Sequence, residues 1–445
     1  MEWQKLVSNK RVPSLSYDYE NTACITAFDS DYRRVVKSDA FRRLQDKTQV
    51  FPLERNDFVR TRLTHSLEVA MVSRDILTEV IKELKNSGKN IDLLNDSYRL
   101  METAALIHDI GNPPFGHFGE EAIRIWFKKN GSKLECWDAL STQQQFDFLN
   151  FEGNAQTIRL LTKIYDYNGS SANGMRLTAS VLDSVIKYTA TSAEVNKDYL
   201  LRKKIGYFFS EETEFFAIKE ATGTGTVRHP LVFLLEAADD ISYTFSDVED
   251  AYGYGLYSFD QIKNFLEKET KLSTDKIFKD IYSSSDNAIF QRFIRETQQK
   301  VYKSASQVFV SNYNKIMNGN FTSDLMIEAS DEIKLFNALK KFAHKHIFNT
   351  KEILDQEVLG FNIMSRLLDE FVPVTLKYQK TGQFMNKYEE RLFNNISESA
   401  KTLYKKEVES YTDESIRDYY RLKMAVDFVC NMTDGYAKKL HDTLF

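Results

Sequence analysis

The sequence predicts an all-α fold. Only six prolines and 17 glycines interrupt 445 residues, and apolar residues recur every three or four positions through long segments. Short aromatic pieces such as GYFFS at 206–210 could form a small hairpin, but they are too few to set the fold class. No repeat of fixed period is present to indicate a solenoid.

The apolar spacing predicts helices over 33–45, 63–84, 96–110, 117–129, 154–166, 176–190, 230–250, 259–268, 286–315, 331–345, 350–378, 386–409 and 412–443. In the second of these, the expected buried stripe has His65 beside it and consists of Leu63, Leu67, Ala70, Met71, Ile76 and Val80. Loops are predicted at 131–150, 165–174 and 223–226. We expect a catalytic body over 1–260, which includes an N-terminal basic segment, and a helical C-terminal region over 261–445.

The composition excludes several classes of protein. No window approaches the roughly 18 apolar residues of a membrane span, and the first residues, MEWQKLVSNKRVPS, lack the apolar run of a secretory signal. We therefore expect a cytoplasmic protein with no membrane partner. Cys24, Cys136 and Cys430 lie far apart, which argues against a disulfide framework or a thiolate metal site. Any metal must then be held by histidines and carboxylates.

Charge is distributed unevenly along the chain. The net charge of −5 argues against a protein that coats nucleic acid. Residues 33–62, however, hold nine Lys or Arg against four acids, a local charge of +5. A basic pocket on an acidic protein suits a small polyanion such as a phosphate ester, although a solvated helix face would explain the same run of charges.

The stretch HDIGNPPFGHFGEEAI at 108–123 concentrates groups that bind metals and transfer protons. His108 and Asp109 end an apolar helix just before a Gly-Asn-Pro-Pro turn. Together with His65 and Asp239 they would provide two imidazoles and two carboxylates, a set that suits Mn, Fe, Co or Mg better than structural zinc. A buried histidine bonded to a neighbour is the simpler alternative. We expect one metal ion, because His344, His346 and His441 lie far along the chain.

Two further side-chain sets share helix faces. His117 and Glu120 stand three residues apart, so the carboxylate can orient the imidazole as a general acid or a general base. The sequence leaves open whether His117 acts as the acid or as the base. Asp239, Tyr243 and Asp247 follow at four-residue steps and could bind sugar hydroxyls outward from the metal. Ordinary amphipathic helices would show the same spacings.

Several longer strings carry a resemblance to a known family. The set His65, His108, Asp109 and Asp239 resembles the HD-domain phosphohydrolases. RRLQDKTQVFPLERN, VRTRLTHSLEV, HDIGNPPFGHFGE, FEGNAQ and EAADDISY resemble the deoxyguanosine triphosphate triphosphohydrolase family, most strongly over about 30–250 and then through KHIF and MTDGYA. That resemblance implies an all-α HD-domain core and metal-dependent hydrolysis of a deoxynucleoside triphosphate to deoxynucleoside and triphosphate. It also implies a homohexamer.

The resemblance further implies a role for each matching residue. The metal ligands would be His65, His108, Asp109 and Asp239, and the catalytic pair His117 and Glu120. The phosphate contacts would be Arg62, Asn154, Lys187 and Tyr188. The 3′ side of the deoxyribose would meet Gln49, Tyr243 and Asp247, and the base would meet Val50, Phe348 and Glu357. IFNTKEILDQEVLG, around the last two, departs from the family pattern.

The function predicted is hydrolysis of dGTP with one divalent ion per subunit, Mn, Mg, Co or Fe. The C-terminal region would complete the base pocket and the oligomer contacts. A broad-specificity dNTP triphosphohydrolase activated by a second nucleotide is the alternative, and weak binding of single-stranded DNA is left open. A phosphodiesterase explains the basic residues less well. A nucleic-acid-binding regulator with a decayed site conflicts with the complete ligand set.

Overall fold

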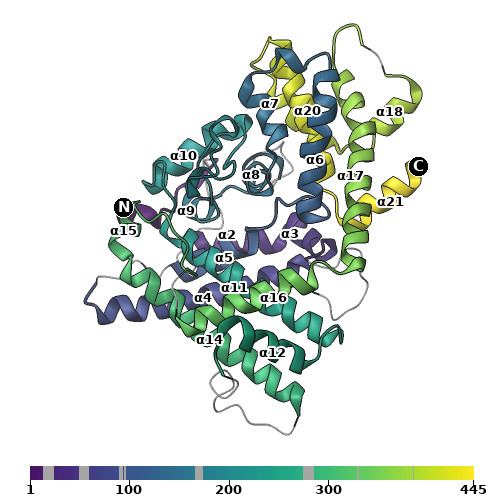
Figure 1. Ribbon diagram of the computed structural model, residues 1–445. Coiled ribbons are helices and arrows are strands. Elements are labelled where there is room, and N and C mark those ends of the chain that lie inside the picture. Colours follow the sequence, from purple (N-terminus) through teal and green to yellow (C-terminus); the bar gives the residue numbers. More distant parts are fainter. Residues whose placement is uncertain are drawn as a thin grey trace.

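The structure is a computed structural model that describes residues 1–13, 25–49, 60–89, 94, 97–165, 174–273, 285–327, 330–383 and 385–445. Helices dominate it, which confirms the all-α prediction (Figure 1). The only strand pair in these ranges joins β1 (Arg11–Val12) to β2 (Leu177–Thr178) in antiparallel register. Within the same ranges, no helix combines the length and apolar character needed to cross a membrane.

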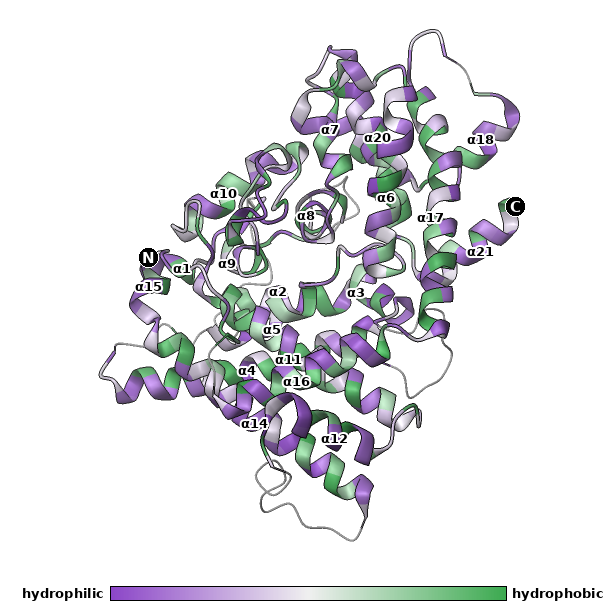
Figure 2. Cartoon of the chain, in the orientation of Figure 1, coloured by the Kyte–Doolittle hydropathy of each residue, from purple (hydrophilic) through white to green (hydrophobic). Residues whose placement is uncertain are grey.

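One group of helices packs around a long central helix, α4 (Arg62–Asn86). It contacts α5 (Ser97–Ile107), α11 (Pro230–Gly253) and α14 (Asp286–Ser311). Their apolar faces meet in a first hydrophobic cluster that runs from Val12 to Ile353. Figure 2 shows many hydrophilic residues along α12 and α14, which lie at the edge of this group. The other members are α1 (Trp3–Leu6), α2 (Ala27–Lys37), α3 (Asp39–Arg43), α9 (Ala179–Asp183), α10 (Glu212–Thr222), α12 (Phe259–Thr270), α15 (Tyr313–Met317) and α16 (Asp331–Phe342).

A second group of helices stands beside the first. Here α17 (Lys351–Lys377) packs against α6 (Gly116–Asn130) and α20 (Glu414–Cys430), as Figure 1 shows. A second hydrophobic cluster runs from Phe115 to Leu440. The remaining helices are α7 (Thr142–Leu149), α8 (Gly153–Arg159), α18 (Lys387–Phe393), α19 (Glu398–Glu407) and α21 (Asp434–Leu444). Each cluster uses residues from both halves of the chain, and the division near residue 260 stays a prediction.

Several predicted boundaries were wrong. Residues 131–150, predicted as a loop, contain α7, because Ser141 and Gln144 form a capping box and Phe148 is buried. The helix α10 was not predicted. The helix predicted over 176–190 is limited to α9 after β2, and residues 206–210 pass into a short 3₁₀ turn at Phe209–Glu211 rather than a hairpin.

The last two predicted helices are each divided in two. A new helix begins after residue 397 because the Ser397 side chain accepts a hydrogen bond from the Ala400 N–H. Another begins after Thr433, whose side chain accepts from the Tyr436 N–H. These caps separate α18 from α19 and α20 from α21, which positions the C-terminal helices around α17.

The buried stripe predicted for α4 was only partly right. Ala70, Ile76 and Val80 are buried, but Leu67 is 50% exposed and Met71 57% exposed. The face turned toward α5 and α11 runs instead through His65. Leu67 lies two residues, or about 200°, around the helix from His65, so its side chain points outward.

Candidate active site

The four predicted metal ligands meet between α4, α5 and α11. His65 lies in the first turn of α4, His108 and Asp109 directly follow α5, and Asp239 lies in the middle of α11. Ligand atoms of His65, His108 and Asp109 lie within 4.8 Å of one another. Oδ1 of Asp239 is 3.1 Å from Nε2 of His65 and 3.4 Å from Nε2 of His108. The structure therefore brings together all four residues from three separate helices.

Local hydrogen bonds fix the position of the histidines. Thr61 caps α4 through a capping box with Thr64, which places His65 in the first turn. Nδ1 of His108 lies 2.7 Å from the carbonyl oxygen of Ala105. If Nδ1 donates there, Nε2 of His108 keeps its lone pair toward the carboxylates, where it has no hydrogen-bond partner among the described residues.

Basic side chains hold the two carboxylates of this cluster ionised. Burial alone would raise the pKa of Asp109, but His108 and the Arg62 guanidinium lower it to about 2. Burial is likewise outweighed at Asp239, where Lys187 and His108 keep the pKa well below its usual range. Nζ of Lys187 lies 3.2 Å from Oδ2 of Asp239. Ionised carboxylates beside a buried imidazole nitrogen are donors that suit a divalent cation.

His117 and Glu120 form a hydrogen-bonded pair at the start of α6. Nδ1 of His117 lies 3.0 Å from Oε2 of Glu120. The His117 side chain is 84% exposed, whereas that of Glu120 is 3% exposed. The hydrogen bond to Glu120 raises the pKa of His117. Burial would raise the pKa of Glu120, but the bond from His117 lowers it. The exposed His117 imidazole is thus oriented by its hydrogen bond to the buried, ionised carboxylate of Glu120.

A close approach of α8 supports this pair. The N–H of Gly153 donates to Oε1 of Glu120 over 2.7 Å. A Cβ at Gly153 would lie 2.1 Å from Oδ1 of Asn112 and 2.9 Å from Oε1 of Glu120. At Gly111 a Cβ would lie 2.1 Å from the backbone nitrogen of Thr157. Glycine is therefore required on both sides of this contact.

Two of the four predicted phosphate contacts, Arg62 and Lys187, lie at the same cluster. Arg62 and Lys187 bind its carboxylates, and Asn154 directly follows Gly153. Tyr188 lies beside Arg228, whose guanidinium carbon is 5.7 Å from the ring centroid. Two cations thus border the cluster, and phosphate contacts from Asn154 and Tyr188 stay predictions.

Sequence reasoning missed Lys204. Its Nζ donates to Oε2 of Glu152 over 2.8 Å. Its charge also acts on His117, Glu120 and Tyr188, where it lowers each pKa alongside larger effects. Lys204 lies in the 190–230 segment, which has no long helical pattern, so no local signal in the sequence indicates its position.

The three predicted sugar contacts lie in different environments. Tyr243 lies one turn after Asp239 on α11, and Nζ of Lys340 is 5.3 Å from its ring centroid. Asp247 is buried, and burial followed by the charge of Asp250 raises its pKa well above the usual range. Gln49 is partly buried, and its Oε1 has no hydrogen bond to any residue in the described ranges.

The predicted base contacts lie farther along the chain. Val50 lies outside the described residues. Phe348 packs beside His344, with ring centroids 6.3 Å apart, and Glu357 is half-buried on α17. Within the described part of the chain, no hydrogen bond, ion pair or ring contact joins Phe348 or Glu357 to the His65 cluster. Their part in a base pocket stays a prediction.

Comparison with known proteins agrees with this geometry. The HD domain family matches residues 62–146, which include His65, His108 and Asp109. The helical fold and the His/Asp cluster define a phosphohydrolase of the HD-domain class.

Full-length relatives narrow the class. A deoxyguanosinetriphosphate triphosphohydrolase-like protein of Listeria monocytogenes is 37% identical over 465 aligned positions, covering 100% of this chain and 99% of the relative. The deoxyguanosinetriphosphate triphosphohydrolase of Serratia proteamaculans is 33% identical, and the alignment covers 93% of this chain and 92% of the relative. That of Yersinia enterocolitica is 34% identical, and the alignment covers 96% of this chain and 94% of the relative. The chain belongs to the deoxyguanosinetriphosphate triphosphohydrolase family, and it is a hydrolase.

Proposed function

We propose that this enzyme hydrolyses dGTP to deoxyguanosine and inorganic triphosphate with the help of one divalent ion per subunit. The observation that carries the proposal is the buried His/Asp cluster with the His117–Glu120 pair supported beside it by Gly153. The names of the full-length relatives support dGTP as the substrate.

In this proposal His65, His108, Asp109 and Asp239 hold the ion. The fit rests on Nε2 of His108, which is buried 3.4 Å from Oδ1 of Asp239 and makes no hydrogen bond within the described residues, and on the two ionised carboxylates facing it. When bound, a divalent ion would polarise a phosphoryl oxygen and offset its developing charge. The donor set suits Mn, Mg, Co or Fe.

The chain's own cations would hold the triphosphate. Arg62 and Lys187 border the cluster, and Lys204 adds a third positive charge near His117. Asn154 and Tyr188 provide hydrogen-bonding groups. Positioned charges of this kind orient a phosphoryl group for in-line attack and stabilise the charge that develops on its oxygens.

His117 would protonate the leaving group. Water attacks the α-phosphorus, a phosphorus–oxygen bond forms, and the bond from phosphorus to the 5′ oxygen breaks. A proton from Nε2 of His117 goes to that oxygen and releases a neutral nucleoside. The attacking water releases one proton to solvent, and solvent later returns a proton to His117. The acid role is favoured because Glu120 occupies the Nδ1 side and its hydrogen bond raises the pKa of His117.

Sugar and base selection would involve the more distant predicted residues. Gln49, Tyr243 and Asp247 would meet the deoxyribose, and Val50, Phe348 and Glu357 the base. The C-terminal region would complete this pocket and supply the contacts of a homohexamer. Because IFNTKEILDQEVLG departs from the family pattern, a broad-specificity dNTP triphosphohydrolase activated by a second nucleotide is the second candidate.

One assay separates these functions. The purified enzyme is incubated with each of the four dNTPs and with GTP in Mn or Mg, and the products are separated by anion exchange. We expect triphosphate from dGTP, with kcat/KM at least about tenfold above that for GTP, since a ribose hydroxyl would be buried without a partner. Equal rates for all four dNTPs would favour the broad-specificity enzyme. Release of dGMP would contradict both.

A further inference from the structure

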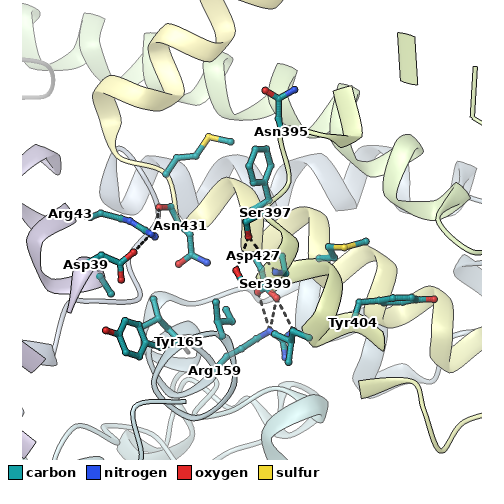
Figure 3. Close-up of a pocket in the computed structure, with 18 of the residues that line it drawn as sticks. Asp39, Arg43, Arg159, Tyr165, Asn395, Ser397, Ser399, Tyr404, Asp427 and Asn431 are labelled. Atoms are coloured by element: carbon teal, nitrogen blue, oxygen red, sulfur yellow. Dashed lines mark hydrogen bonds and ion pairs between the residues drawn. The ribbon is translucent and has the colours of Figure 1, made fainter. Parts of the chain in front are cut away.

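A cavity of about 670 Å³ lies at the C-terminal end of α8. Gly153 and Thr157 of α8 bind Glu120 and Gly111, whereas Arg159 and residues after it line the cavity. Its other walls come from α3, α19, α20 and the start of α21. Figure 3 shows Asp39 and Arg43 on one side, Tyr404 on the other and Arg159 between them. The volume is within the range of small-molecule sites.

The charges that line the cavity are already paired. The described lining holds three carboxylates and two guanidiniums, a formal charge of −1. Arg159 is buried and binds Glu407 and Asp427 at 2.7–3.2 Å. Arg43 pairs with Asp39. A polyphosphate would meet no unpaired cation on these walls and a net negative charge, which disfavours a nucleotide.

The uncharged lining is rich in aromatic rings and hydrogen-bonding groups. The rings belong to Tyr165, Tyr404, Tyr420, Phe428 and Tyr436. The uncharged polar groups belong to Asn395, Ser397, Ser399, Asn431 and Thr433, most of them toward solvent. The Ser397 and Thr433 hydroxyls already cap α19 and α21, and the Asn395 amide nitrogen donates to the carbonyls of Arg391 and Leu392. Rings suit a planar base, and the Asn431 amide, the Asn395 amide oxygen and the Ser399 hydroxyl suit its edges and a sugar.

We propose that this cavity is a second binding site, for an uncharged nucleoside. The proposal rests on the proposed function, because the deoxynucleoside released by the hydrolysis is an uncharged nucleoside that this enzyme would meet. The cavity would take the product of the reaction and exclude its triphosphate substrate.

Hydrogen bonds connect the cavity to the turn at residues 111–115, which directly precedes α6. Its lining residues at 431–433 lie between Cys430 and Asp434. Nζ of Lys47 donates to the carbonyl oxygens of Cys430 over 3.2 Å and Asn112 over 2.6 Å. The N–H of Phe115 donates to Asp434 over 3.0 Å. A ligand that shifts residues 431–433 would therefore move the turn that precedes His117.

Thiol protection tests the location of binding directly. Ser399→Cys places an exposed thiol at the rim, and Ser87→Cys places a matched one at the exposed end of α4. The native Cys136 and Cys430 are buried, and Cys24, which lies outside the described residues, is replaced by serine in every variant. We expect saturating deoxyguanosine to slow alkylation of Ser399→Cys at least about threefold and to leave Ser87→Cys unchanged. Inorganic triphosphate should protect neither.

A ring-deletion variant tests recognition and coupling. Tyr436→Ala should weaken deoxyguanosine protection about tenfold, because it removes an aromatic wall, whereas the exposed Tyr388→Ala should not. Deoxyguanosine should also change the rate of dGTP hydrolysis, and part of that change should be lost in Tyr436→Ala.

The inference is overturned if millimolar deoxyguanosine does not protect Ser399→Cys, if triphosphate protects it equally, or if Tyr436→Ala responds to deoxyguanosine like the wild type. Protection needs no turnover, so its failure is distinct from failure of the proposed function. An enzyme that bound deoxyguanosine here but released dGMP from dGTP would retain the site and lose the proposed reaction.

Discussion

Glu120 joins His117 to α8: one carboxylate oxygen lies 3.0 Å from Nδ1 of His117, and the other accepts the Gly153 N–H over 2.7 Å. The exposed imidazole is thereby held by a buried group that is fixed at both oxygens. Such support occupies Nδ1 of His117 and directs Nε2 away from Glu120.

Replacing His117 should separate chemistry from binding. His117→Ala is expected to lower kcat by about 10² to 10⁴ while KM and metal content stay unchanged, because a proton-transfer group is lost without a ligand. Glu120→Ala should be milder. Steady-state kinetics and metal analysis of the purified variants measure this. An increase in KM with unchanged kcat would assign His117 to binding instead.

The titration of His117 should depend on Glu120. In the wild type the pKa of His117 should lie above its ordinary 6.5, since the hydrogen bond to the carboxylate stabilises the imidazolium. In Glu120→Gln the pKa should fall, so the protonated form is lost at lower pH. For a general acid, the alkaline limb of kcat/KM should then shift to lower pH. NMR titration of His117 in the wild type and in Glu120→Gln measures its pKa. The same pKa in both proteins would show that Glu120 does not influence the titration of His117.

The contact at Gly153 should tolerate no side chain. Gly153→Ala inserts a methyl group where Asn112 and Glu120 lie within 3 Å, which should destabilise the fold by about 1–3 kcal/mol and lower kcat. Gly253→Ala is a matched control because a Cβ there meets no atom within 4 Å. Thermal unfolding and kinetics of both variants compare them. Equal stabilities would show that α8 can move away from Glu120.

Removal of a predicted ligand should remove metal and activity together. His65→Ala or Asp109→Ala leaves an incomplete set of donors, so bound metal and turnover should both be lost. Elemental analysis after dialysis measures the bound metal, with the C-terminal variant His441→Ala as a control that removes a histidine outside the cluster. A fully occupied His65→Ala protein with normal turnover would exclude His65 as a ligand.

Features that depend on residues close together in the sequence were predictable, whereas contacts between residues far apart in the sequence were not. The helix that carries His65 and the spacing of His117 and Glu120 follow from periodicity within one turn or one helix. The Glu120–Gly153 bond joins residues 33 positions apart, and Asp434 reaches Phe115 across 319 positions. No pattern in a single sequence indicates such contacts.

Helix packing also overrode simple hydrophobic patterning. Leu67 and Met71 fit an apolar stripe but face outward, because the histidine face of α4 is the one that α5 and α11 cover. The sequence of α7, TQQQFDFL, has few apolar residues, and its capping box and one buried phenylalanine define the helix instead. Lys204 reaches the site from a segment without helical periodicity.

The central claim, attack of water on the α-phosphorus with departure of the nucleoside, is tested most directly by hydrolysis of dGTP in H₂¹⁸O. Mass spectrometry of both products locates the new oxygen. The account predicts one ¹⁸O atom in the inorganic triphosphate and none in deoxyguanosine. Label in the 5′ hydroxyl of deoxyguanosine, or release of dGMP with pyrophosphate, would contradict it.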